Sequence, residues 1–133
     1  EVNEEEQQKI EEEFKDIVSK IKDKLGSEVK DVKITSRLDS FASCITKDAQ
    51  DAQMAAMAHM FRAMGQEAPE VKPLLEINPN HEIVKKLQSS TNDELIEDVS
   101  WILLDLAKIS EGVDVSDKVA FAKRLSKITA KAL

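Results

Sequence analysis

The run Val-Ser-Trp-Ile-Leu-Leu-Asp-Leu-Ala-Lys-Ile occupies residues 99–109, and only Ser100, Asp105 and Lys108 in it are polar. Its spacing predicts a helix that is apolar on nearly every side. A helix at a protein surface shows one apolar stripe, so a helix of this kind has to be enclosed. A chain of 133 residues has few other elements to enclose it. A second chain would supply the missing surface.

This run belongs to a predicted helix pair over residues 92–133. Residues 91–94, Thr-Asn-Asp-Glu, have the spacing of a capping box, Gly112 ends the first helix, and Ser116 is expected to cap the second. The first helix carries acidic residues and the second basic ones, namely Asp93, Glu94, Glu97, Asp98 and Asp105 against Lys118, Lys123, Arg124, Lys127 and Lys131. Opposite charges favour pairing within one hairpin or across a symmetric bundle, and both arrangements remain open.

The upstream sequence alternates between helix and strand patterns. Residues 1–25 contain an amphipathic helix, which Asn3 caps and Gly26 ends. Strand patterns follow at residues 32–34, 38–45 and 74–77, and Asn78-Pro79 resembles a helix start. The sequence therefore predicts one α+β domain over residues 1–133, with a small three-stranded sheet flanked by helices.

Residues 46–64 predict a further amphipathic helix, which begins after Thr46 and Asp48 and closes at Gly65. One face of it carries every methionine of the chain, together with a phenylalanine: Met54, Met57, Met60, Phe61 and Met64. Met-rich faces recur on surfaces that bind many partners. The ordinary alternative is that these side chains fill an irregular core.

Composition excludes several classes of function. The net charge is −7 and aromatic residues make up 4% of the chain, which argues against binding to nucleic acid or to an anionic membrane surface. No apolar run is long enough to cross a bilayer, and no signal segment is visible. The single cysteine, Cys44, indicates a reducing, cytoplasmic location. The first residue is Glu, so the chain is expected to be processed or cut from a longer protein.

The candidates for catalysis are few. Three scattered glycines form no phosphate-binding motif, and His59 and His81 with one cysteine form no metal-ligand cluster. Asp39-Ser40 resembles the attachment site of acyl carrier proteins, but it lies in a strand pattern. We expect no enzyme activity, cofactor or metal. An enzyme that uses Cys44 as its nucleophile is the competing class.

Residues 65–87 resemble a known family. The run includes Gly65-Gln66, Pro69-Glu70-Val71-Lys72 and Leu75-Glu76-Ile77-Asn78-Pro79-Asn80-His81-Glu82-Ile83-Val84-Lys85, and the upstream run Ser36-Arg37-Leu38-Asp39-Ser40 matches as well. These segments resemble the C-terminal domain of the ninety-kilodalton heat-shock chaperones, in particular the bacterial HtpG type. The order of elements agrees from about residue 10 to the end of the chain.

The resemblance implies a homodimer in which the last two helices of each chain form a four-helix bundle. The positions expected at the dimer interface are Val99, Ile102, Leu103, Leu106, Phe121, Leu125 and Ile128. The ATP site of the family lies in an N-terminal domain that this chain does not include. The runner-up is a monomeric module that binds another protein through the same helix pair.

The resemblance also implies that residues 46–64 contact unfolded client proteins. Met57 and Phe61 match the apolar positions of the family's helix, and Met60 replaces a similar residue. Met54 is displaced by one position, and Met64 stands where alanine is common. Two further departures are Phe41, where many members have proline, and a chain end without the acidic tail that recruits co-chaperones. No tail-recruited co-chaperone is therefore expected.

Overall fold

The computed structural model describes residues 4–35, 41–67 and 71–133. Asn3, the Ser36–Ser40 run with its Asp39-Ser40 pair, and Pro69 lie outside the described residues. The elements in chain order are α1 (Glu4–Leu25), a short 3-10 turn (Gly26–Glu28), β1 (Asp31–Ile34), β2 (Ser43–Thr46), α2 (Ala49–Ala63), β3 (Leu74–Ile77), α3 (Glu82–Ser89), α4 (Asp93–Ser110) and α5 (Lys118–Ala132). The α+β class with a three-stranded sheet is confirmed.

The sheet is mixed, and its strand order is β1-β3-β2. β3 runs parallel to β1, with Val32 opposite Leu75, and antiparallel to β2, with Ile45 opposite Leu75. As the central strand, β3 is the most deeply buried, and Leu75 and Ile77 have no exposed surface. Of the predicted second strand, 38–45, residues 38–40 lie outside the described residues. β2 runs from Ser43 to Thr46, so Phe41 and Ala42 precede it.

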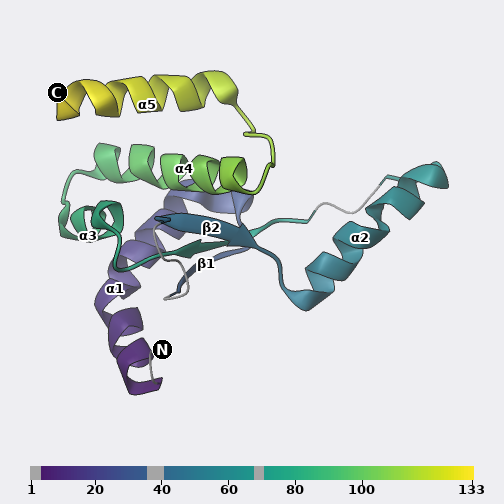
Figure 1. Ribbon diagram of the computed structural model, residues 1–133, viewed down its shortest axis with the longest axis horizontal. Helices are drawn as coiled ribbons and strands as arrows, with labels where there is room; N and C mark the ends of the chain where they lie inside the picture. The colour runs from purple at the N-terminus through teal and green to yellow at the C-terminus, as the bar shows by residue number, and fades with distance from the viewer. Residues whose placement is uncertain (1–3, 36–40, 68–70) are drawn as a thin grey trace.

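Two long helices cover the sheet. α4 packs along β2 and against α1, while α1 packs along β1 (Figure 1). α1 buries Phe14, Ile17, Ile21 and Leu25, which recur every three or four residues on one helix face. The hydroxyl of Ser43 donates to the carbonyl oxygen of Leu103 at 2.7 Å and fastens β2 to α4. The core therefore lies between α1, α4 and the sheet.

The expectation that Asn78-Pro79 starts a helix is wrong. Asn78 is buried, and its backbone N–H donates to Ala42 at 2.8 Å while its side-chain amide donates to Phe41 at 3.1 Å. Its side-chain oxygen accepts from the N–H of Asn80. These bonds hold Asn78 in a turn at the end of β3, so α3 begins later, at Glu82, with His81 Nδ1 accepting from the N–H of Ile83.

The helix pair is confirmed as two helices, with different caps. Asn92 caps α4 by accepting from the N–H of Leu95 at 3.1 Å. Ser116 does not cap α5, because its hydroxyl accepts from the ammonium group of Lys108. Asp117 takes that role and accepts from the N–H of Ala120 at 3.0 Å. Gly112, with φ +74°, ends the first helix in a conformation that favours glycine.

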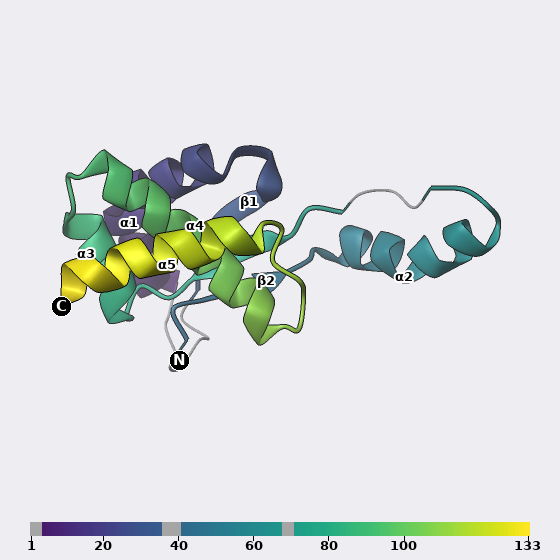
Figure 2. The same ribbon diagram turned by 90° about the horizontal axis from the view of Figure 1, so that it is seen from above.

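α2 projects from the rest of the molecule, as Figures 1 and 2 show from two directions. It has no buried residue. At its first turn, the Lys30 ammonium pairs with the carboxylates of Asp48 and Asp51, and Asp48 also caps the helix by accepting from the N–H of Asp51. The hydrogen bond from Lys30 holds the pKa of Asp48 below its ordinary value. In the described part of the chain, no helix combines the length and apolarity needed to cross a membrane.

Candidate interaction surfaces

α4 has two apolar faces, which accounts for the mostly apolar run at residues 99–109. One face carries Ile96, Leu103, Leu104 and Ala107, each at most 1% exposed, and packs into the core. The other face carries Leu95, Val99, Ile102 and Leu106, which are spaced by four, three and four residues. A helix with two such faces needs covering on both sides. The first face is fully covered by the core. On the second, Val99 touches the core cluster and Ile102 is only 7% exposed, whereas Leu95 and Leu106 are only half-buried.

The second face of α4 lines an apolar groove, which we call the α3–α4–α5 groove. Its volume is about 340 Å³, and its remaining walls are Ile83, Lys86, Leu87 and Ser90 from α3 and its end, and Leu125 and Ile128 from α5. Ile83 is 38% exposed and Leu125 43% exposed, so the groove is open to solvent on the single chain. A groove with such walls is suited to aliphatic side chains from outside.

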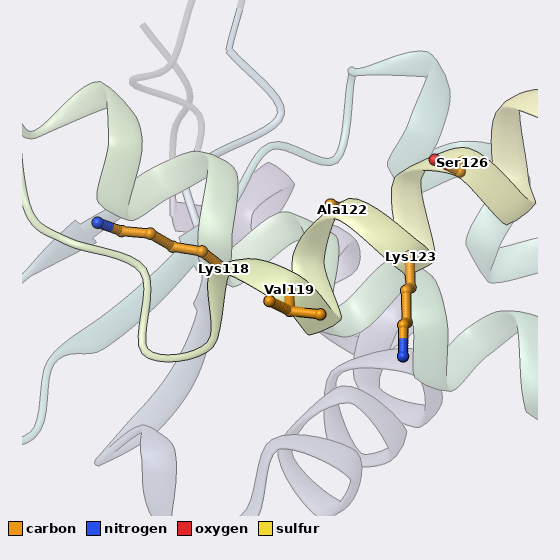
Figure 3. A pocket seen from close by; sticks show the side chains of 5 residues that line it. All are labelled: Lys118, Val119, Ala122, Lys123 and Ser126. Atoms are coloured by element: carbon orange, nitrogen blue, oxygen red, sulfur yellow. The ribbon is translucent and has the colours of Figure 1, made fainter.

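α5 is covered on one side only. It lies against α4 and has no buried residue along its length (Figure 1). Figure 3 shows its outward face, where Val119 and Ala122 lie between the side chains of Lys118 and Lys123, with Ser126 one turn further on. Val119 is 65% exposed. An amphipathic helix without any buried side chain gains little stability from the chain that carries it.

The opposite charges of α4 and α5 meet within the hairpin. The Lys127 ammonium lies 2.8 Å from the Glu94 carboxylate and 2.6 Å from that of Asp98. These hydrogen bonds, chiefly the one to Asp98, raise the pKa of Lys127, and Lys127 lowers the pKa of Glu94. The Arg124 guanidinium stacks over the Trp101 ring, 4.8 Å from its centroid. These contacts fix how α5 lies along α4.

The structure brings five of the seven expected interface residues together in the groove: Val99, Ile102, Leu106, Leu125 and Ile128. Phe121 lies half-buried on α5 outside the groove lining. The prediction that Leu103 lies at the interface is wrong, because its side chain has no exposed surface and belongs to the core cluster. Sequence reasoning missed Ile83 and Leu95. The spacing of residues 95, 99, 102 and 106 would have indicated Leu95. No local pattern in the sequence indicates that Ile83 on α3 lies beside this stripe of α4.

The α2 surface, defined as Met54, Met57, Met60, Phe61 and Met64, faces solvent. Met57, Met60 and Met64 are 41%, 59% and 65% exposed, while Met54 and Phe61 are half-buried. These side chains therefore do not fill a core in this chain. The surface ends at Gly65, whose φ of +78° closes the helix.

The residues considered for chemistry are dispersed. Cys44 is half-buried on β2, and its thiol donates to the Glu76 carboxylate at 3.8 Å. His59 lies on α2, and His81 caps α3. Over residues 4–35, 41–67 and 71–133, no three His, Cys, Asp or Glu side chains are grouped to hold a metal ion.

The fold and these surfaces define an α+β module that presents an apolar groove and a separate Met-rich helix. Comparison with known proteins gives the family. A family model described as "Hsp90 protein" matches residues 1–133. The chain is 68% identical over 133 residues to the "Chaperone protein HtpG" of Aliarcobacter butzleri, covering 100% of this chain and 21% of that protein.

Two further relatives carry the same name. The HtpG chaperone of Sulfurovum sp. is 54% identical over 130 residues, 98% of this chain and 21% of the relative. That of Treponema denticola is 41% identical over 124 residues, 92% of this chain and 19% of the relative. The chain thus spans about a fifth of the length of the relatives it matches. It belongs to the Hsp90 family of chaperones.

Proposed function

We propose that this chain is the C-terminal homodimerisation module of an HtpG-type chaperone. The observation that carries the proposal is the open α3–α4–α5 groove, beside a helix, α5, that has no buried residue. Its occupant is the helix pair of a second copy, which would complete a four-helix bundle. The C-terminal position in the parent rests on the resemblance of residues 65–87 to that domain.

A second copy suits this surface for two reasons. In a two-fold dimer, the same patch of each chain meets its copy, so one groove and one half-covered helix serve both partners. The charges are also complementary, since Lys118, Lys123 and Lys131 on α5 take part in no ion pair among the described residues, and Glu97 is exposed on α4. Acidic and basic helices favour antiparallel or crossed pairing of unlike helices across the bundle.

The role in the parent follows from physical linkage. Two chains held together at one end keep their other domains at a high effective concentration, so a closure of those domains becomes nearly intramolecular. In the resembled family that closure is driven by ATP bound in an N-terminal domain. We assign no catalytic step to this chain, and its lone cysteine fits a reducing cytoplasm.

The test is the mass in solution by light scattering over a dilution series. We expect twice the chain mass of 14.9 kDa, persisting to low concentration. Leu125→Glu places a charge in the groove and is expected to shift the chain to the monomer. The matched control is Ile109→Glu, because Ile109 is 51% exposed at the end of α4 and does not line the groove.

A mass of 14.9 kDa at every concentration would refute the dimer. It would leave the groove to a different protein, which is the monomeric alternative. If Leu125→Glu and Ile109→Glu weakened the dimer equally, the groove would not be the dimer interface, although the original chain would still be a dimer.

The α2 surface supports a second function, contact with partly unfolded client proteins. Its exposed, adaptable thioethers project from the molecule on a helix that contributes nothing to the core. Met side chains fit irregular apolar surfaces without a fixed shape. A client docked there would cover Met57, Met60 and the neighbouring Phe61.

Met57→Ser with Met60→Ser tests this surface. Since both side chains are exposed, we expect an unchanged melting temperature and a weaker suppression of aggregation of thermally unfolding citrate synthase. Ala55→Ser with Ala58→Ser introduces the same two hydroxyl groups on the opposite side of α2 and serves as the control. Loss of stability in the methionine variant would place those side chains in a folding role. Equal suppression by both variants would refute the client surface.

A further inference from the structure

The methionines of this chain are confined to one place. Three lie on α2 and the fourth, Met64, is its C-cap residue; none lies in the α1–α4–sheet core, whose apolar side chains are Ile, Leu, Val, Phe and Ala. Three of them are more than 40% exposed. A random distribution would place some methionines in the core, where this residue commonly fills irregular gaps, and some on the surface. Here any chemistry that attacks thioethers reaches a single surface and spares the core.

Exposure governs that chemistry. A peroxide transfers one oxygen atom to the thioether: R–S–CH₃ + H₂O₂ gives R–S(=O)–CH₃ + H₂O, in which sulfur loses two electrons and the peroxide O–O bond breaks. The product is polar, so an oxidised methionine no longer favours an apolar contact. A methionine sulfoxide reductase reverses the step: two thiols supply two electrons and two protons and become a disulfide, and the sulfoxide oxygen leaves as water.

The rest of α2 is built to survive this change. Asp48 caps the helix, Lys30 ties its first turn to the body through Asp48 and Asp51, and Gly65 closes it. None of these contacts involves a methionine sulfur. Oxidation therefore alters the chemistry of the α2 surface while the helix and the core remain in place.

We propose that the α2 surface is a reversible peroxide-sensitive site, at which oxidation of Met57, Met60 and Met64 to the sulfoxides switches off client contacts without unfolding or dissociating the protein. The proposal rests on the client-binding function proposed above. The order of exposure sets the order of reaction: Met64 and Met60 oxidise before Met57, and half-buried Met54 oxidises last.

The test treats the full chain with hydrogen peroxide and maps the added oxygen atoms by peptide mass spectrometry. Suppression of citrate synthase aggregation, far-ultraviolet circular dichroism and solution mass are followed in parallel. We expect the protein concentration needed for suppression to rise at least about tenfold, as when a buried apolar contact is lost, with the spectrum and mass unchanged. Methionine sulfoxide reductase with a dithiol restores the original value.

The matched control is Met57→Leu with Met60→Leu and Met64→Leu, which keeps the surface apolar but cannot be oxidised there. We expect it to suppress aggregation equally before and after peroxide. Loss of activity in this variant too would assign the effect to another group, such as Cys44, and overturn the switch.

An active protein that stays active with its α2 methionines fully oxidised would overturn the switch alone. Oxidation of Met54 before Met60 and Met64 would also overturn it, because exposure would then not govern the reaction. An untreated protein without any effect on aggregation would refute the client surface itself, and the switch with it.

Discussion

Leu103 and Leu125 provide the sharpest test of how the two faces of the helix pair are used. Both are leucines on helices that were expected to form one interface. Leu103 has no exposed surface and packs in the core, whereas Leu125 is 43% exposed and lines the α3–α4–α5 groove. The same deletion, Leu→Ala, should therefore have different consequences at the two positions.

At Leu103, the deletion leaves a cavity in the core. We expect the free energy of unfolding to fall by about 2–5 kcal/mol, because the lost transfer energy and the cavity both count against the folded state. The groove keeps its lining, so the dissociation constant of the folded chain should hardly change.

At Leu125, the exposed 43% is what a partner would cover. Full burial of a leucine is worth about 1.5–3 kcal/mol, so covering that fraction twice in a symmetric dimer gives about 1.3–2.6 kcal/mol. This corresponds to a dissociation constant raised roughly tenfold to seventyfold. Fluorescence-detected sedimentation measures the constant, and urea unfolding at several protein concentrations separates it from the stability of the single chain.

The reasoning would be refuted by the opposite pattern, in which Leu103→Ala weakens the dimer at unchanged stability. It would also be refuted if Leu125→Ala left the dissociation constant within a factor of two.

Three further predictions concern individual side chains. Burial raises the pKa of Asp105 above its ordinary 3.8, outweighing the opposite effect of Lys108 and Arg124, so the folded state holds this proton more firmly than the unfolded state. The stability that this group contributes is therefore lost as pH rises through its folded pKa. Asp105→Asn should raise the urea midpoint at pH 7, and the difference in midpoint between the variant and the original chain should narrow toward pH 4. A difference that widens on acidification would show that burial does not raise the pKa of Asp105. Gly112→Ala should lower the free energy of unfolding by about 1 kcal/mol, because φ is +74° while no atom lies within 4 Å of the new Cβ, and an unchanged urea midpoint would show that the turn relaxes. Asp117→Ala should cost about 1 kcal/mol through loss of the α5 cap and reduce helical circular dichroism, whereas Ser116→Ala should leave that cap in place.

Local patterns in the sequence determined most of the elements. The stripe Phe14, Ile17, Ile21 and Leu25 specified α1, and the alternation around Val32 specified β1. Gly65 and Gly112 marked helix ends, since the left-handed backbone there suits glycine. These features act over a few residues, so they can be read without knowing what lies next to them in space.

The misplaced helix starts show where that reasoning stops. Ser116 is a good cap by residue type, but Lys108 uses its hydroxyl from the preceding helix. Asn78 is also a good cap by residue type, but it donates hydrogen bonds to the carbonyl oxygens of Phe41 and Ala42, which directly precede β2. In both cases the competing partner comes from elsewhere in the chain.

The sequence by itself also determined that residues 99–109 of α4 are apolar on nearly every side and that residues 54–64 carry a methionine stripe. It did not determine which way those side chains face. Tertiary structure decided that Leu103 belongs to the core and Leu106 to the groove, and that α2 stands away from the body with its thioethers in solvent. The physical reason is that hydrophobicity has no direction: it requires apolar surface to be covered, and only the arrangement of α1, the sheet and α5 shows which surface remains uncovered.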